Sequence, residues 1–161
     1  MAKKIKTILI SQPKPTTEKS PYFDLAERQK LTIDFRPFIH VEGIDAHEFR
    51  QQRIDLASHT AVILTSRNAA DHYFRLAEDL RFEVPETMKY FCISESTAYY
   101  LQKYVTYRKR RIFHGKQRFQ DLVDSLKKHK KETFLLPCSD LLKPSIPQLL
   151  DEIKVNYSKA M

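Results

Sequence analysis

The chain has 161 residues, which is room for one full domain and part of another. Its 42% hydrophobic and 30% charged residues predict a packed core under a charged surface, which excludes global disorder. A net charge of +8 favours an anionic partner, whereas a total of two glycines excludes the glycine-rich phosphate loops of classical nucleotide-binding sites.

The first predicted elements are a strand, a helix and a second extended segment. Residues 6–10 form a short apolar run typical of a strand, and Ser20-Pro21 begins a helix that continues to about residue 30. Residues 32–41 alternate apolar and polar side chains, and Pro37 restricts them to an edge strand or an extended connector. We place a domain boundary near residue 38.

The second part of the chain alternates predicted strands and helices. The strands are expected at residues 61–65, 90–93, near 105 and 133–136, and the helices at 46–56, 68–80, 96–103, 119–129 and 146–153. The first of these strands is apolar throughout, as in parallel strands covered on both faces. The sequence therefore predicts an α/β fold, in which a parallel β-sheet has helices on both faces in a flavodoxin-like three-layer domain. An N-terminal β-α-β piece of a second, similar domain precedes it.

Apolar segments are short, and the cysteines form no pattern. No run approaches the roughly 20 residues that a membrane-spanning helix needs, and the basic start is followed only by the short apolar residues 8–10. Cys92 and Cys138 match no disulfide framework, zinc site or redox motif, and buried packing is favoured over covalent catalysis, by a narrower margin for Cys138. We expect a cytoplasmic protein with reduced cysteines and no membrane partner.

Hydroxyl side chains gather in the turns that follow the predicted strands. In open parallel sheets, ligands bind at the carboxyl ends of the strands, where hydroxyls and helix N-terminal N–H groups suit carboxylates or phosphates. For Ser66, Ser96 or Ser139 taken alone, helix capping is the more common role. Together, the turns favour a binding site. The candidate residues are Ser11, Thr65, Ser66, Ser94, Ser96, Thr97 and Ser139.

The histidines and a run of basic residues give weaker signals of function. The histidines are scattered, lack metal-ligand spacing and are expected at the solvated surface, so no metal site is predicted. They are His40, His47, His59, His72, His114 and His129. Residues 108–111 read Arg-Lys-Arg-Arg between aromatic side chains, a pattern that could neutralise phosphates and stack on bases, although such charged loops are usually just solvated. Nucleic acid is therefore not the expected partner.

Four segments of the chain, taken in order, carry a family resemblance. They are residues 8–13 (ILISQP), 61–69 (AVILTSRNA), 91–98 (FCISESTA) and 134–137 (FLLP). Together they resemble the uroporphyrinogen-III synthase family of tetrapyrrole biosynthesis. The most telling are the turn at residues 64–70, similar to F-T-S-x-x-A-V, and the turn at residues 93–98, similar to V-G-x-x-T-A. The chain departs from the family where Ser11-Gln12-Pro13 replaces Thr-Arg-Pro, which removes a cation, and where Ser94 replaces a glycine.

The resemblance implies a domain organisation. Family members have two α/β domains, and their chain leaves the first domain early, builds the second and then returns. Residues 1–38 would be an incomplete first domain, 39–156 a complete α/β domain and 157–161 the start of the return linker. The chain would then be a fragment of a longer protein, with apolar surface exposed on its first piece.

The resemblance also implies an activity. Family members cyclise the linear tetrapyrrole hydroxymethylbilane, with inversion of its last pyrrole ring and loss of water, in a cleft between the two domains and without cofactor or metal. Thr97 matches the family's implicated threonine and would be catalytic, and the other six hydroxyl residues would bind substrate. The substrate is a polycarboxylate, which would give the positive charge a specific partner. The full-length enzyme would be a monomer, and this chain alone would have little activity and could self-associate.

The sequence alone leaves two alternative functions. One is a non-catalytic flavodoxin-like interaction module. A receiver domain of this kind would need an acidic pair after the first strand and an aspartate after the central one, and neither Ser11-Gln12 nor Thr65-Ser66 supplies them. The other, less favoured, is a basic nucleic-acid-binding domain that uses residues 108–111.

Overall fold

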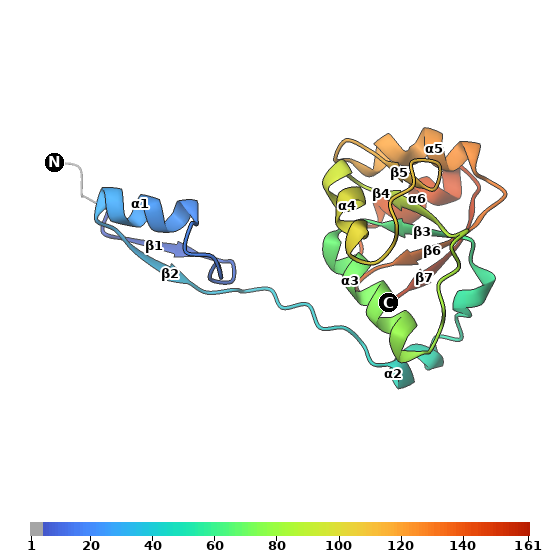
Figure 1. The fold of residues 1–161 in the computed structure, drawn as a ribbon, viewed down its shortest axis with the longest axis horizontal. Helices are drawn as coiled ribbons and strands as arrows, with labels where there is room; N and C mark the ends of the chain where they lie inside the picture. Colours follow the sequence, from blue (N-terminus) through green and yellow to red (C-terminus); the bar gives the residue numbers. More distant parts are fainter. Residues whose placement is uncertain (1–4) are drawn as a thin grey trace. The chain divides into compact units, whose positions relative to one another are not determined.

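The computed structural model describes residues 5–161 and divides them into two compact units. The first unit ends at Glu42 and the second is Gly43–Met161 (Figure 1). Each unit is described by itself. Within the described residues, no helix combines the length and the apolar character needed to cross a membrane.

The first unit contains one helix against two parallel strands. Strands β1 (Thr7–Ile10) and β2 (Thr32–Phe35) pair in parallel, and α1 (Pro21–Gln29) connects them. As predicted, Ser20 caps α1, because its Oγ accepts the Tyr22 N–H at 3.4 Å, and proline follows at the first helical position. Two strands make a small sheet, and Leu9 of β1 remains 55% exposed.

The second unit is built on a five-stranded, wholly parallel sheet with the strand order β5-β4-β3-β6-β7. Its strands are β3 (Ala61–Leu64), β4 (Lys89–Cys92), β5 (Ile112–His114), β6 (Thr133–Pro137) and β7 (Asn156–Ala160). Its α-helices are α2 (Ala46–Gln51), α3 (Arg67–Asp79), α4 (Glu95–Tyr100), α5 (Val123–Lys128) and α6 (Ser145–Glu152). Short 3-10 turns are η1 (Leu56–Ser58), η2 (Leu101–Lys103) and η3 (Phe119–Leu122).

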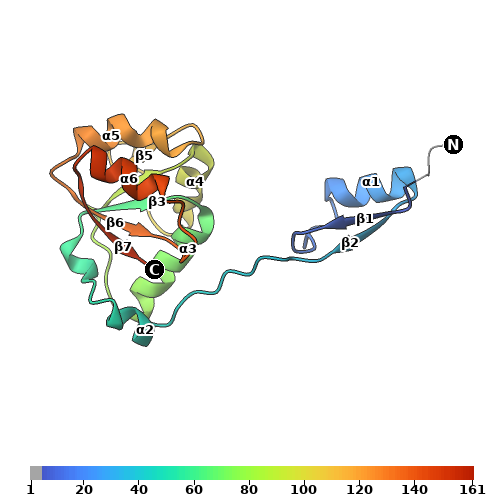
Figure 2. The same cartoon turned by 180° about the vertical axis from the view of Figure 1, so that it is seen from behind.

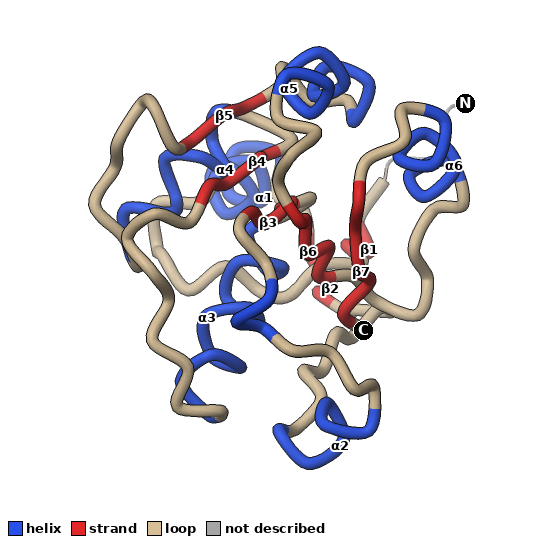
Figure 3. Tube along the Cα trace, turned by 90° about the vertical axis from the view of Figure 1, so that its right-hand side faces the viewer, coloured by secondary structure: helices blue, strands red, loops and turns tan. Residues whose placement is uncertain are grey.

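Helices cover both faces of this sheet. Figure 3 shows α3 and α4 on one side of the strands and α5 and α6 on the other, and Figure 2 shows the same layers from behind Figure 1. Strand β3 feeds both cores: Val62 and Leu64 pack with the α3 and α4 side, and Ala61 and Ile63 with the α5 and α6 side. All four side chains are fully buried. The predicted α/β fold with a doubly covered parallel sheet is confirmed.

One predicted strand was misplaced. The sequence predicts a strand near residue 105, but there the chain ends the α4–η2 segment, and the N–H groups of Tyr104 and Val105 both donate to the Leu101 carbonyl at 2.9 Å. The strand in this region is β5, which directly follows the basic run 108–111. Val105 still packs against the core, so its apolar character signalled burial rather than a strand.

Two predicted boundaries also moved. The helix expected at residues 46–56 ends at Gln51, and Arg53 then adopts a left-handed φ of 55°. Its predicted start is confirmed, because Asp45 Oδ1 accepts the Glu48 N–H at 2.7 Å. At the other end of the unit, the residues expected to begin a linker at position 157 lie in β7, whose pairing with β6 continues to Ala160. The sheet therefore extends beyond the expected domain end.

Gly115 lies where the turns after β4 and β5 approach each other closely. The Gly115 N–H donates to the Cys92 carbonyl at 3.0 Å. A Cβ at this position would lie 2.8 Å from the Asp121 Cβ and 3.0 Å from the Ile93 carbonyl oxygen. The second neighbour is backbone and has little room to move.

We expect Gly115→Ala to lower the free energy of unfolding by about 1 to 3 kcal/mol, because the added methyl overpacks this turn. Gly43→Ala is the matched control, since a Cβ there would meet the ends of the flexible Arg75 and His72 side chains. Urea titrations of both variants measure the difference. An equal loss in both variants would contradict the role given to close backbone approach.

Candidate functional site

The carboxyl ends of β3 and β4 bring five of the predicted hydroxyl residues to one edge of the sheet. Thr65 and Ser66 follow β3, and Ser94, Ser96 and Thr97 follow β4, its neighbour in the sheet. Ser66 caps α3, because its Oγ accepts the Ala69 N–H at 3.0 Å. The capping role expected of Ser66 is confirmed, and the cap leaves its side chain exposed.

A network of three hydroxyls forms at the start of α4. Ser94 Oγ lies 3.1 Å from both Ser96 Oγ and Thr97 Oγ1, and it also accepts the Thr97 N–H at 3.3 Å. Ser94 is therefore the cap of α4, and the capping role expected for Ser96 is wrong. Ser96 is exposed, whereas Thr97 is 4% exposed. Ser94 links the buried hydroxyl to the exposed one.

Of the remaining two hydroxyl residues, Ser139 lies at the same carboxyl edge, after the strand β6 that pairs in parallel with β3, and Ser11 lies in the other unit. Ser139 comes after β6 and is exposed, and its carbonyl accepts the Leu142 N–H at 3.2 Å. Because α6 begins only at Ser145, Ser139 caps no helix, contrary to the capping alternative. Ser11 follows β1 in the first unit and is exposed.

A basic loop lies at the same edge and was missed in the sequence. The turn after β5 carries Lys116 and Arg118, both exposed, beside the end of β4. Asp121 Oδ2 accepts the backbone N–H groups of residues 116, 117 and 118 at 3.0 to 3.1 Å. These bonds, that of Arg118 foremost, lower the pKa of Asp121. The bonds shape the loop and leave both cationic side chains at the edge. The sequence signal was a glycine followed by two nearby cations after a strand, which is weak alone.

A carboxylate between α3 and α4 organises the helices on this side. Asp71 accepts hydrogen bonds from the hydroxyls of Tyr100, at 2.8 and 3.0 Å, and Tyr104, and from Lys103 Nζ at 3.1 Å. The Arg67 guanidinium sits 5.4 Å above the Tyr100 ring. Burial opposes ionisation of Asp71, but these donors together outweigh it and lower its pKa. The cluster fixes the first turns of α3 against α4.

The packing role predicted for Cys92 agrees with the structure, whereas the surface position predicted for the histidines is wrong for one of them. Cys92 is fully buried in β4, and burial raises the pKa of its thiol to about 12, which agrees with a packing role. Cys138 is partly buried, and burial also raises its pKa. The expectation of surface histidines is wrong for His59, which is 5% exposed and whose Nδ1–H donates to the Asp55 carbonyl at 2.8 Å. This bond satisfies a ring nitrogen next to the η1 turn, which lowers the cost of burial.

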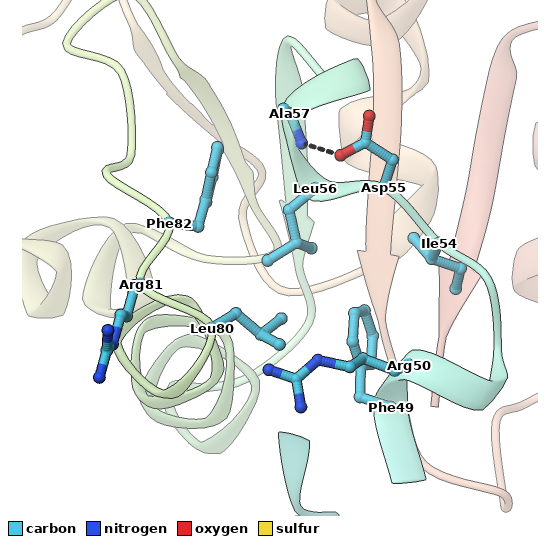
Figure 4. Close-up of a pocket in the computed structure, with 9 residues that line it drawn as sticks. All are labelled: Phe49, Arg50, Ile54, Asp55, Leu56, Ala57, Leu80, Arg81 and Phe82. Atoms are coloured by element: carbon cyan, nitrogen blue, oxygen red, sulfur yellow. Dashed lines mark hydrogen bonds between the residues drawn. The ribbon is translucent and has the colours of Figure 1, made fainter. Parts of the chain in front are cut away.

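A cavity of about 280 Å³ opens between the α2–η1 segment and the end of α3, away from the predicted site residues. Figure 4 shows Phe49, Leu56, Leu80 and Phe82 around it, with Asp55 turned back to accept the Ala57 N–H at 2.9 Å. The Asp55 carboxylate therefore caps η1. No hydroxyl or amide from the candidate set lines this cavity.

The fold and the site together define a class. An all-parallel three-layer domain of this kind is an α/β domain of the open-sheet type, a class in which ligands bind at the carboxyl ends of the strands. The family model for uroporphyrinogen-III synthase HemD matches residues 21–161, so the chain belongs to the uroporphyrinogen-III synthase family.

Solved structures from the bacterium Thermus thermophilus have the same fold. A mutant uroporphyrinogen III synthase matches with a TM-score of 0.65 and 15% identity over 98% of this chain and 61% of that one. The wild-type enzyme matches with a TM-score of 0.57 and 15% identity over 97% and 60% of the two chains. A third structure, Thermus thermophilus uroporphyrinogen III synthase, has a TM-score of 0.54 at 16% identity, over 97% and 61%. The chain thus spans about three fifths of these proteins. No curated protein sequence matches it.

The Asp71 cluster predicts a pH-dependent stability. Because the folded pKa is lowered, ionised Asp71 stabilises the fold above the ordinary value of 3.8, and this contribution is lost as the pH falls through the folded pKa. We expect Asp71→Asn to cost up to about 1 kcal/mol near neutral pH, because solvent screens this partly exposed carboxylate, with a difference from wild type that shrinks below about pH 4.

Urea unfolding at neutral pH and at about pH 3 measures this difference. Asp79→Asn is the control on the same helix, since its pair with Arg75 at 2.7 Å is at the surface and is expected to contribute well under about 1 kcal/mol. A loss for Asp71→Asn that is the same at both pH values would contradict the proposed role of its charge.

Proposed function

We propose that this chain carries the substrate-binding α/β domain of a uroporphyrinogen-III synthase, and that its carboxyl edge binds the linear tetrapyrrole hydroxymethylbilane. The full-length enzyme would close this substrate into a ring with inversion of the last pyrrole and loss of water. The observation that carries the proposal is the Ser94-Ser96-Thr97 hydroxyl network, in a chain that belongs to this family.

The charge distribution at this edge supports a polycarboxylate ligand. Lys116 and Arg118 extend from the turn after β5, and Ser66 begins the thirteen-residue helix α3, whose N-terminus also favours anions. Cations and helix dipoles attract carboxylates, and hydroxyl donors orient them without adding a competing charge. The edge can therefore hold several carboxylates through different kinds of donor.

The hydroxyl network suits a reaction that needs positioning rather than a nucleophile. Loss of water from hydroxymethylbilane requires the departing hydroxyl to take up a proton, and ring closure releases a proton from the attacked pyrrole. We propose that exposed Ser96, oriented by Ser94 and buried Thr97, hydrogen-bonds the departing oxygen. Donors held in place before the reaction stabilise developing charge at little reorganisation cost. Thr97 would then act mainly by fixing this network.

The proposal assigns binding to this chain and full turnover to the longer enzyme, because the solved relatives are longer than the chain. Binding and turnover are therefore measured separately.

Thr97→Val tests the network. Valine keeps the volume of the buried side chain and removes the hydroxyl, so we expect about tenfold weaker binding of uroporphyrinogen III, a cyclic polycarboxylate of the same class, at low salt. Calorimetry under anaerobic conditions measures it. The exposed Thr87→Val, in the loop before β4, is the matched control and should bind as wild type. Unchanged binding by Thr97→Val, or no binding by the wild-type chain, would overturn the proposal.

Lys116→Ala combined with Arg118→Ala tests the cations. We expect weaker binding and a smaller dependence of affinity on salt concentration, because two charges that meet carboxylates are removed. Lys130→Ala combined with Lys131→Ala removes the same charge from the turn before β6, at the other edge. If both double variants weaken binding equally, net charge rather than this loop attracts the ligand.

A further inference from the structure

A second cavity lies at the opposite, amino edge of the sheet. It has a volume of about 230 Å³ and opens between the loop that leads into β4 and the loop that leads into β5. Because residues at the starts of both strands line it, it is separate from the carboxyl edge. Its lining includes Val84, Met88, Tyr90, Tyr104, Arg108 and Arg111.

Part of the lining of this cavity is apolar and held in place, beside charged residues that include Glu86. Met88 and Ile112 are buried where β4 and β5 begin. Tyr104 is fixed on two sides, because its ring stacks on Phe74 with centroids 4.3 Å apart and its hydroxyl donates to Asp71. A cavity with a rigid aromatic wall suits a flat, apolar molecular body.

A buried hydroxyl in the lining has no partner. Tyr90 is 3% exposed, and within the part of the chain that the structure describes its Oη makes no hydrogen bond. Buried polar groups in folded proteins are nearly always paired, and an unpaired one bears the full cost of losing water. Burial also raises the pKa of Tyr90, so the phenol stays neutral and able to donate. Tyr90 lines the cavity, but its hydroxyl is covered from solvent.

Two arginines line the same cavity. The Arg108 carbonyl accepts the Arg111 N–H at 2.9 Å, so one tight turn carries both side chains. Arg108 Nη2 lies 3.5 Å from Glu86, whose side chain is largely exposed, and such surface pairs are weak. Among residues 5–161, Arg111 forms no ion pair. A carboxylate could therefore pair with Arg111 and compete with Glu86 for Arg108.

We propose that this cavity binds a small aromatic monocarboxylate, with its ring against Met88 and Tyr104 and its carboxylate toward the two arginines. An apolar cavity of about 150 Å³ accommodates benzene, so the larger volume here has room for one ring and one carboxylate. A linear tetrapyrrole is far too large for it. The site is thus distinct from the carboxyl edge, and the inference does not rest on the proposed function.

Benzoate is the probe for the test, and the full 161-residue chain is the protein. We expect saturable binding with a Kd of about a millimolar or tighter, from the few non-hydrogen atoms that such a ligand offers. Changes in the amide NMR spectrum should be centred on residues 84–90 and 104–112. Benzyl alcohol, which lacks the charge, and inorganic phosphate, which lacks the ring, should each bind at least about tenfold more weakly.

Arg111→Gln should weaken benzoate binding about tenfold, whereas Arg110→Gln, which removes the same charge beside the cavity, should not. Tyr90→Phe is a control for packing. It should leave benzoate binding unchanged and the free protein as stable as wild type or more so, because it deletes a covered hydroxyl that has no partner.

Three results would overturn the inference. They are no saturable change at residues 84–90 and 104–112, equal binding by Arg111→Gln and Arg110→Gln, and phosphate binding as tight as benzoate. Spectral changes confined to the carboxyl edge would also overturn it, and they would assign the anion to the site of the proposed function instead.

Discussion

The rest of the second unit depends on the burial of β3 from both sides. Four consecutive apolar side chains from Ala61 to Leu64 are withdrawn from water, two into each core, so helices must cover both faces of the sheet. The five strands are all parallel, and the crossover connections between parallel strands place helices on the two faces. Parallel strands end at one edge, which gathers the hydroxyl turns there and leaves the loops that enter the strands at the other.

The sequence predicts this architecture well, because apolar runs and helix caps are local signals. The strand at Ala61 and the caps at Ser20, Asp45 and Ser66 were recognisable from a few adjacent residues. The prediction of a strand near Val105 was wrong for a physical reason. A single buried side chain in a turn has the same hydropathy as one in a three-residue edge strand, and only the sheet partner β4 distinguishes them.

The candidate site was predicted in part. Hydroxyls after strands were visible in the sequence, but which serine caps a helix depends on where the helix begins, and α4 begins one residue earlier than expected. Ser94 therefore takes the capping role, with φ at −143° in extended backbone that any residue adopts. The family's glycine is not needed there for its conformation, and serine adds a hydroxyl to the network. Lys116 and Arg118 became site candidates only when β5 was placed beside β4.

The scarcity of glycine and the abundance of cations both show at the C-terminal ends of helices, where lysine or arginine takes positions that often hold glycine. Left-handed backbone after a helix favours glycine, yet here Lys30, Arg53, Arg81 and Lys154 adopt φ values of 52 to 55°. Each costs about 1 kcal/mol relative to glycine, which a cation at the negative end of a helix partly offsets. Part of the +8 charge is thus explained by chain reversal rather than by a ligand. We therefore propose an anionic substrate from the position of a few cations at the carboxyl edge, not from net charge.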